Sequence, residues 1–258
     1  MIESIIVAKK YKKTFLKQVL VRVDFQKPLE YYEKGLNTTV EKTIKKTFPT
    51  MVEQKIKLQS IQVESGQTKV STSDQTLWTY YAKDKKKHAR IEPTDFYIQY
   101  DKYYSFEQLK KDFRLVFDSL VANYGELNIT RIGLRYIDEI EIKQEKDVFD
   151  WKKYLNPNLF SALSIPLKKD RYFISRAFSN LEFNYGDHNL TLKYGMFNPD
   201  YPSPIKKKVF ILDSDAYKRD NIPNEKAYCV LDQLHDRISN LFEKRLIKEG
   251  LREIMDDS

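Results

Sequence analysis

Cysteine, histidine and glycine are scarce in this sequence, and their scarcity excludes several kinds of site. Cys229 is the only cysteine among 258 residues, so no internal disulfide can form, which favours a reducing cytoplasm. The three histidines are far apart, and no pair has the spacing of metal ligands. The seven glycines are scattered, so neither a phosphate-binding loop nor a nucleophile elbow can be drawn. We therefore expect no metal, no cofactor and no catalytic residues.

Long apolar runs are also missing. No stretch approaches the roughly 20 residues that a membrane-spanning helix needs. The short apolar run near the start, Met1–Val7, lacks the basic residues and the cleavage site of a signal peptide. The sequence predicts a soluble cytoplasmic protein without a membrane contact.

Aromatic side chains, by contrast, are abundant. The chain has 18 Tyr and 15 Phe, and 41% of its residues are hydrophobic. This composition can fill a substantial core and is typical of aromatic-faced sheets, not of a disordered chain. The length allows one large domain or two of ordinary size.

Basic residues are in excess and gather in three clusters. There are 45 Lys and Arg against 37 Asp and Glu, which gives a formal charge of +8. Such clusters suit phosphates or an acidic protein surface, although solubility alone could also explain them. We expect nucleic-acid contacts, through phosphates, from Lys85, Lys86, Lys87, Lys168, Lys169, Arg171, Lys206, Lys207 and Lys208.

The middle of the chain reads as a long strand. Between residues 130 and 142, apolar and polar residues alternate with a period of two, which predicts one buried and one polar face. Arg131 and Arg135 share the polar face, and Gly133 between them leaves room for another group. The two arginines could bind a phosphate or carboxylate ligand, or could form structural ion pairs with Glu139, Glu141 or a helix acid.

Acidic residues on the strands raise two further expectations. Asp138 interrupts the apolar face of the central strand, and a buried acid needs a partner, so we expect a cross-strand arginine beside it. Asp213 and Asp215 could form a carboxylate pair. We expect them to point to opposite faces of their strand and to mark the turn toward the next helix.

The order of the expected elements is strand, helix, several strands and helix, and the same order then repeats. Two pairs of short segments, at residues 95–103 and 209–217 and at 21–23 and 134–136, match at a spacing close to 114 residues. We predict an α+β fold of two similar halves, residues 1–126 and 127–258, each a mostly antiparallel sheet covered by helices. One continuous domain is the alternative.

Four blocks of the sequence resemble a sporadically distributed bacterial family of about 250 residues. They are Phe15–Phe25, Arg131–Asp138, Leu212–Tyr217 and the last helix through Leu231–His235 and Phe242–Glu243. Most members of that family are uncharacterised. Some resemble accessory ("pro-CRISPR") factors, which act as homodimers and help type II-C RNA-guided nucleases to engage target DNA. The family supplies no catalytic residues.

The resemblance implies a non-catalytic accessory protein that binds a type II CRISPR RNA-guided nuclease and works as a homodimer. A stand-alone defence or regulatory protein is the first alternative; it would bind a small anionic ligand or nucleic acid through the basic sheet face at Arg131 and Arg135. An enzyme with a dispersed site is the second.

Overall fold

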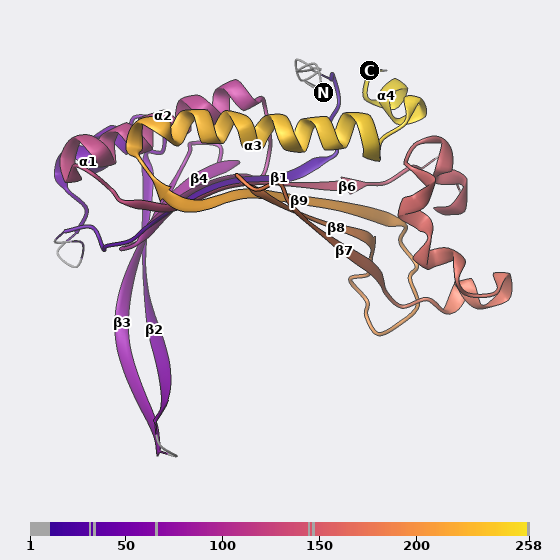
Figure 1. The fold of residues 1–258 in the computed structure, drawn as a ribbon, viewed down its shortest axis with the longest axis horizontal. Helices are drawn as coiled ribbons and strands as arrows, with labels where there is room; N and C mark the ends of the chain where they lie inside the picture. The colour runs from indigo at the N-terminus through magenta and orange to yellow at the C-terminus, as the bar shows by residue number, and fades with distance from the viewer. Residues whose placement is uncertain are drawn as a thin grey trace.

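The computed structural model describes residues 11–30, 32, 35–64, 67–143, 145 and 148–256, and these form one nine-stranded sheet with helices on one face (Figure 1). All neighbouring strands are antiparallel, in the order β2-β3-β4-β5-β1-β6-β9-β8-β7. The expected α+β class is confirmed. The strands are β1 (Leu16–Phe25), β2 (Thr50–Glu64), β3 (Gln67–Tyr81), β4 (Lys87–Ile91), β5 (Asp95–Tyr100), β6 (Ile129–Ile140), β7 (Ala177–Asn184), β8 (Asn189–Phe197) and β9 (Val209–Ile222).

Strand β6 is the central segment recognised in the sequence. Its side chains alternate as expected, with Ile132, Leu134 and Tyr136 buried toward the helices. Arg131 and Arg135 lie on the opposite, uncovered face. β1 pairs with one edge of β6 and β9 with the other.

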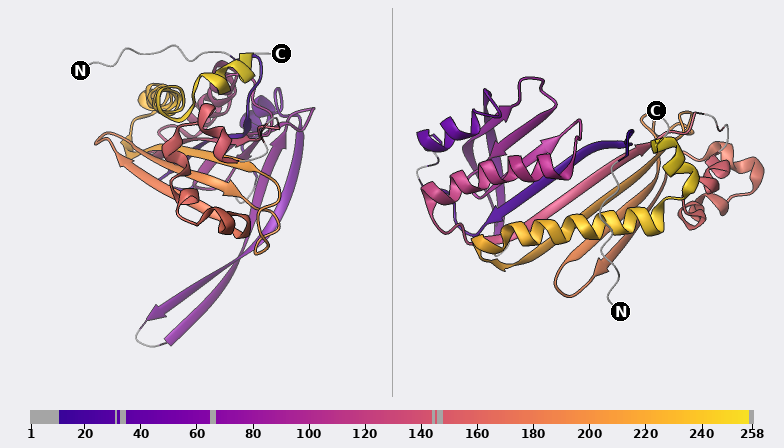
Figure 2. Two further views of the ribbon diagram at one scale, coloured as in Figure 1. Left: turned by 90° about the vertical axis from the view of Figure 1, so that its right-hand side faces the viewer. Right: turned by 90° about the horizontal axis from the view of Figure 1, so that it is seen from above.

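The helices are α1 (Thr38–Ile44), α2 (Phe106–Tyr124), α3 (Ala227–Leu241) and α4 (Glu249–Asp256). α2 begins as its capping residues predict, because the Ser105 hydroxyl accepts a hydrogen bond from the backbone N–H of Gln108 at 3.2 Å. It ends at Gly125, whose φ of +75° suits glycine. α2 and α3 lie side by side over the sheet (Figure 2), joined by an ion pair of 2.6 Å between Lys110 and Asp232.

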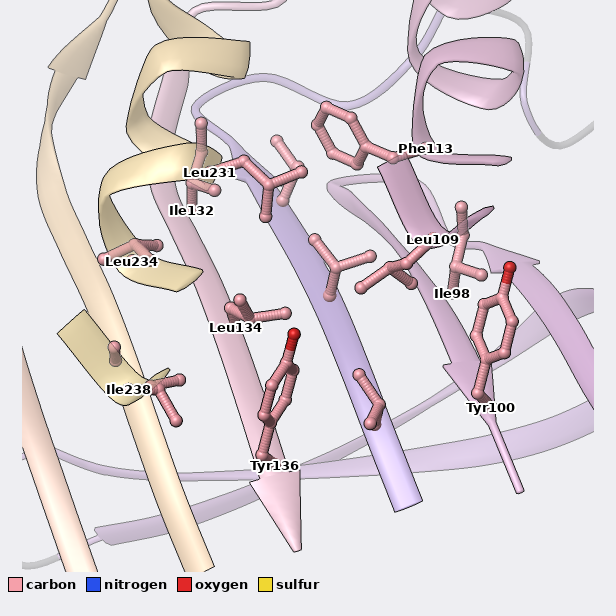
Figure 3. Packing of buried hydrophobic residues seen from close by; sticks show 14 of the residues in the cluster. Ile98, Tyr100, Leu109, Phe113, Ile132, Leu134, Tyr136, Leu231, Leu234 and Ile238 are labelled. Carbon is pink, nitrogen blue, oxygen red and sulfur yellow. The ribbon is translucent and has the colours of Figure 1, made fainter. Parts of the chain in front are cut away.

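The core lies between this helical layer and the sheet. Figure 3 shows Leu134 and Tyr136 of β6 among side chains from α2 and α3, including Leu109 and Leu231. All four are buried. Burying large apolar side chains of this kind stabilises a fold by roughly 1.5–3 kcal/mol each, so this layer is the main source of stability.

Two helices differ from the sequence expectation. Apolar residues three or four positions apart from Leu29 to Ile44 predict one amphipathic helix. The helix covers only Thr38–Ile44, while Leu29 is buried without being helical. The apolar stripe at the end of the chain likewise predicts one helix from about Asn224 to Glu249, but the structure divides it. α3 ends at Leu241, a π-helical turn follows at Phe242–Leu246, and α4 then begins. Both stripes do mark buried residues, but burial does not require an unbroken helix.

β2 and β3 form a long hairpin that projects from the sheet as an arm (Figure 1). The two strands pair in one register from Thr50 with Tyr81 to Glu64 with Gln67. At its base, Trp78 and Tyr80 enter the core. A two-stranded ribbon is at best marginally stable alone, so the arm depends on this base.

The strand order can be compared with the predicted division into two similar halves. β5 returns to lie beside β1, and β9 returns to lie beside β6. The sheet is nevertheless continuous, because β1 and β6 pair directly across the middle. The division at residues 126 and 127 and the internal repeat remain predictions.

Candidate functional site

Strand register places the three basic clusters at one end of the sheet. Lys83–Lys86 precede the first residue of β4, the 3-10 helix Lys168–Phe173 precedes β7, and Lys206–Lys208 precede β9. The pairings carry this end from β4 through β5, β1 and β6 to β9, because Lys87 lies opposite Tyr100, Tyr100 opposite Val19, and Ile140 opposite Phe210. β4 and β9 are four strand spacings apart, about 20 Å. They are also offset along the strands, because the row from Lys87 through Val19 meets β9 at Ser214, five residues after its first residue. We call this end of the sheet the basic end.

The turn before β4 is held by its own hydrogen bonds. The Asp84 carboxylate accepts from the Lys86 backbone N–H at 3.0 Å and from the Tyr104 hydroxyl at 3.2 Å. Lys85 takes up a left-handed φ of 55° at the tip. Lys85 and Lys86 are both exposed, so the turn presents two ammonium groups to solvent on a fixed backbone.

Lys87 is a correction to the expected cluster. Its ammonium is paired with the buried carboxylate of Asp112 and lies 5.4 Å from the ring centroids of both Phe48 and Tyr100. Asp112 also accepts hydrogen bonds from Tyr100 and from Gln108. Lys87 begins β4 with its side chain turned inward, so it neutralises a core carboxylate and is not available to a phosphate.

The other two clusters lie close together. The Ile205 backbone N–H donates to the Ile174 carbonyl at 2.9 Å, which joins the loop before β9 to the segment before β7. Lys168, Lys169 and Lys206 are exposed. Arg171 and Lys208 are half-buried, and Lys207 is exposed but lies 3.4 Å from Glu141.

Exposed aromatic and aliphatic side chains surround the basic cluster at Lys168–Arg171, and the sequence analysis does not predict them. Tyr172 and Phe173 are 76% and 72% exposed, and Ile165 and Leu167 are also exposed. Between residues 165 and 173, apolar residues flank the charged run on both sides, and this pattern is the signal that the sequence offers.

Arg131 and Arg135 form ion pairs with acids of the neighbouring strands. Arg135 holds Asp213 in a bidentate pair at 2.7 and 2.6 Å. Arg131 lies 3.5 Å from Asp215 and 3.9 Å from Asp24, over the ring of Tyr217. The partners are strand acids, not the expected Glu139, Glu141 or helix acid.

The placement of Asp213 and Asp215 was predicted wrongly. Residues two positions apart on a strand share a face, and both carboxylates lie on the uncovered face near Arg135. Burial raises the pKa of Asp215 above its ordinary value, while the two arginines lower it. Bonding to Asp213 raises the pKa of Arg135. Because the charges of this face neutralise one another, it has little attraction left for an anion.

Gly133 leaves space beside the strand, and a side chain of the same protein fills that space. A Cβ atom there would lie 2.6 Å from a guanidinium nitrogen of Arg131. The space beside Gly133 is therefore filled by the side chain of Arg131, folded back over the strand, and not by a ligand or another backbone.

Asp138 lacks the expected arginine. It is buried on the helix side of β6, opposite Leu16 and Leu212, and no ion pair to it is found within the described ranges. Burial alone raises its pKa to about 7. An aspartate in this setting is stable as the neutral acid, which removes the need for a cation.

A buried polar cluster lies on the same face of the sheet. The Tyr136 hydroxyl contacts Nδ1 of His235 at 2.8 Å and the Tyr103 hydroxyl at 3.2 Å. Phe106 stacks on His235 with ring centroids 3.7 Å apart. Burial lowers the pKa of His235 to about 4, so the ring is neutral at physiological pH. The cluster joins α2 and α3 to the centre of the sheet.

No model of a known protein family matches the chain, and a search of curated proteins found no similar sequence. The family resemblance therefore rests on the sequence blocks alone. Within the described part of the chain, no group of three or more His, Cys, Asp or Glu side chains could hold a metal ion. None of the helices there is long and apolar enough to cross a bilayer.

Proposed function

We propose that this chain is a non-catalytic accessory protein that docks on a type II RNA-guided effector nuclease and strengthens its hold on target DNA. The observation that carries the proposal is the basic end, where exposed lysines from clusters far apart in the sequence lie at the same end of the sheet. The resemblance of the four sequence blocks supplies the kind of partner.

The chemistry of the basic end favours phosphate contacts over base reading. Lys85, Lys86, Lys168, Lys169 and Lys206 are exposed and lie on turns, loops or short helical segments. Lysine is a flexible point charge without the geometry to read a base edge. The added binding would then be independent of DNA sequence and would join the nuclease's own contacts in the manner of a linked second site.

The arm and the two edge strands are the surfaces that the proposal assigns to proteins. β2 and β7 form the edges of the sheet, and each leaves backbone groups open to pairing. Phe178 and Leu181 of β7 are both 45% exposed, although they lie on a strand. We propose that one of these edges forms a homodimer and that the arm contacts the nuclease.

The geometry does not favour the alternative, a stand-alone protein that binds a small anionic ligand. A small anionic ligand at Arg131 and Arg135 would have to displace Asp213 and Asp215, which hold those guanidiniums already. We therefore prefer the accessory role.

The direct experiment is to immobilise a type II-C nuclease with its guide RNA and to measure retention of this protein and the rate of target cleavage. We expect the wild type to be retained and to speed cleavage at limiting nuclease. A variant with Lys85→Glu and Lys86→Glu should be retained but should speed cleavage less. If the wild type is neither retained nor stimulatory, the proposal fails.

A further inference from the structure

The helical layer leaves part of the C-terminal sheet uncovered on its own side. α3 packs on β6 and β9, whereas only short 3-10 segments reach β7 and β8, among them Pro157–Phe160. Between α3 and Pro157–Phe160 lies a cleft with a volume of about 440 Å³. That volume is in the range of small-molecule sites.

The floor of this cleft is apolar and aromatic. Leu181 and Phe183 of β7 and Leu192 and Tyr194 of β8 line it. The alternation of the strands explains why. Leu181 and Leu192 are register partners, so they share the face turned toward α3.

The wall formed by α3 and the following π-helical turn is cationic. Arg237, Lys244 and Arg245 line the cleft, and no aspartate or glutamate is among its lining residues. Arg237 and Lys244 are seven positions apart along the helical path and so project from the same side. This cluster differs from the uncovered face, where Arg131 and Arg135 each have a carboxylate beside them.

Arg237 is held in position without being neutralised. Its Nε donates to Nε2 of His188 at 3.0 Å, and Nδ1 of His188 bonds to Asp187 at 2.6 Å. The guanidinium also lies 4.1 Å from the ring centroid of Tyr185. The imidazole of His188 and the ring of Tyr185 orient the cation, and its terminal nitrogens have no hydrogen-bond partner among the described residues.

Hydrogen bonds hold the π-helical turn at one end of the cleft. Asn156 donates its side-chain N–H to the Arg245 carbonyl at 2.8 Å and its backbone N–H to the Leu246 carbonyl at 2.9 Å. These bonds fix the turn that carries Lys244 and Arg245 against the opposite wall.

We propose that this cleft binds a small amphipathic anion, with an alkyl or aromatic body on the Leu181–Tyr194 floor and a carboxylate or phosphate against Arg237, Lys244 and Arg245. Charge complementarity sets the ligand class, because an apolar floor alone would accept a neutral molecule equally well. The proposal is independent of the accessory role.

The test uses decanoate, decyl phosphate and decanol as matched probes in competition with the fluorescent anion anilinonaphthalene sulfonate. We expect both anions to displace the dye and decanol to do so at least tenfold less well, which is the size of a charge-assisted hydrogen bond. Preference between decanoate and decyl phosphate would show whether the natural ligand carries a carboxylate or a phosphate.

Variants separate the cleft from other surfaces. Arg237→Gln and the double change Lys244→Gln with Arg245→Gln should each weaken anion binding about tenfold and leave decanol binding unchanged. Lys193→Gln, on the uncovered face, and the pair Tyr172→Ser with Phe173→Ser are the controls and should leave both unchanged. Melting curves confirm that each variant is folded.

Four results would overturn the proposal. The first is equal affinity for decanol and decanoate, and the second is dye displacement that is insensitive to Arg237→Gln. The third is no displacement by either anion at about 1 mM, which corresponds to binding weaker than about 4 kcal/mol. Loss of binding only in the Tyr172 and Phe173 control would move the site to that surface and would equally contradict it.

Discussion

Lys85, Lys86 and Lys87 are neighbours in sequence with two different roles. Two of them are exposed on a turn, while the third has its ammonium beside Asp112 in the core. The first strand residue after a turn is where the alternation of faces begins, so a one-position step reverses the direction of the side chain. A run of lysines alone cannot show which of them turns inward.

Lys87→Met should therefore destabilise the protein, because it leaves the buried Asp112 carboxylate without its cation. We expect a loss of about 3–5 kcal/mol in the free energy of unfolding, measured by urea titration. The control, Lys85→Gln with Lys86→Gln, should change it by no more than about 0.5 kcal/mol. Equal effects in the two variants would contradict the buried pair.

The buried carboxyl group of Asp138 should make the stability of the protein depend on pH. Its folded pKa of about 7 lies above the ordinary value of 3.8, so the folded state holds the proton more tightly than the unfolded state. The stability contributed by this proton is present at low pH and is lost as the pH rises from about 4 to 7. Asp138→Asn should remove this loss.

The comparison is best made by urea titration at pH 5 and pH 8. We expect Asp138→Asn to raise the free energy of unfolding by roughly 2–4 kcal/mol at pH 8 and by much less at pH 5. Asp170→Asn, at an exposed position, is the control. A gain that is the same at both pH values would mean that Asp138 is not protonated in the fold.

Among the elements, α2 and β6 were the most predictable from sequence, because local signals agreed with the tertiary setting. Ser105, Gln108 and Gly125 mark the ends of α2, and strict alternation marks β6. The break after Leu241 was not predictable, since the apolar stripe continues through it. The ion-pair partners of Arg131 and Arg135 could not be predicted from the sequence either, because β6 and β9 pair residues that are about 80 positions apart in the chain.

The arm allows a prediction at the element scale. The outer part of the hairpin lies outside the body of the protein (Figure 1), and Lys57 and Asp74, near the middle of the two strands, are register partners. Replacing residues 58–73 with Asn-Gly should leave a two-residue hairpin of the kind that antiparallel strands favour. We expect the melting temperature to fall by only a few degrees, while retention on the nuclease is lost.

Two outcomes of this deletion would contradict the prediction. A protein that no longer folds would show that the arm supports the core and is not an appendage. A folded protein that is retained by the nuclease as well as the wild type would show that the arm is not the contact surface.

At the scale of the molecule, the sheet has two open edges, and a homodimer would cover one of them. Both edges carry exposed apolar side chains, Phe178 at 45% on β7 and Met51 and Val52 at 39% and 40% on β2. We assign the dimer to β7 because the proposal gives β2, as part of the arm, to the nuclease. Light scattering at micromolar concentration should give twice the chain mass of 30.8 kDa. Phe178→Lys should return the mass to that of one chain, whereas a monomer in the wild type would contradict the proposal.

The central claim is that the basic end adds phosphate contacts to a DNA-bound nuclease, and the salt dependence of binding tests it most directly. The affinity of the nuclease and guide RNA for target DNA should be measured over a range of salt, with and without this protein. Each added phosphate contact should steepen the fall of log affinity with log salt by roughly 0.9. We predict a steeper slope and tighter binding with the wild type, and an intermediate slope with Lys168→Glu and Lys169→Glu. If the protein changes neither slope nor affinity, the basic end serves solubility alone and the account is contradicted.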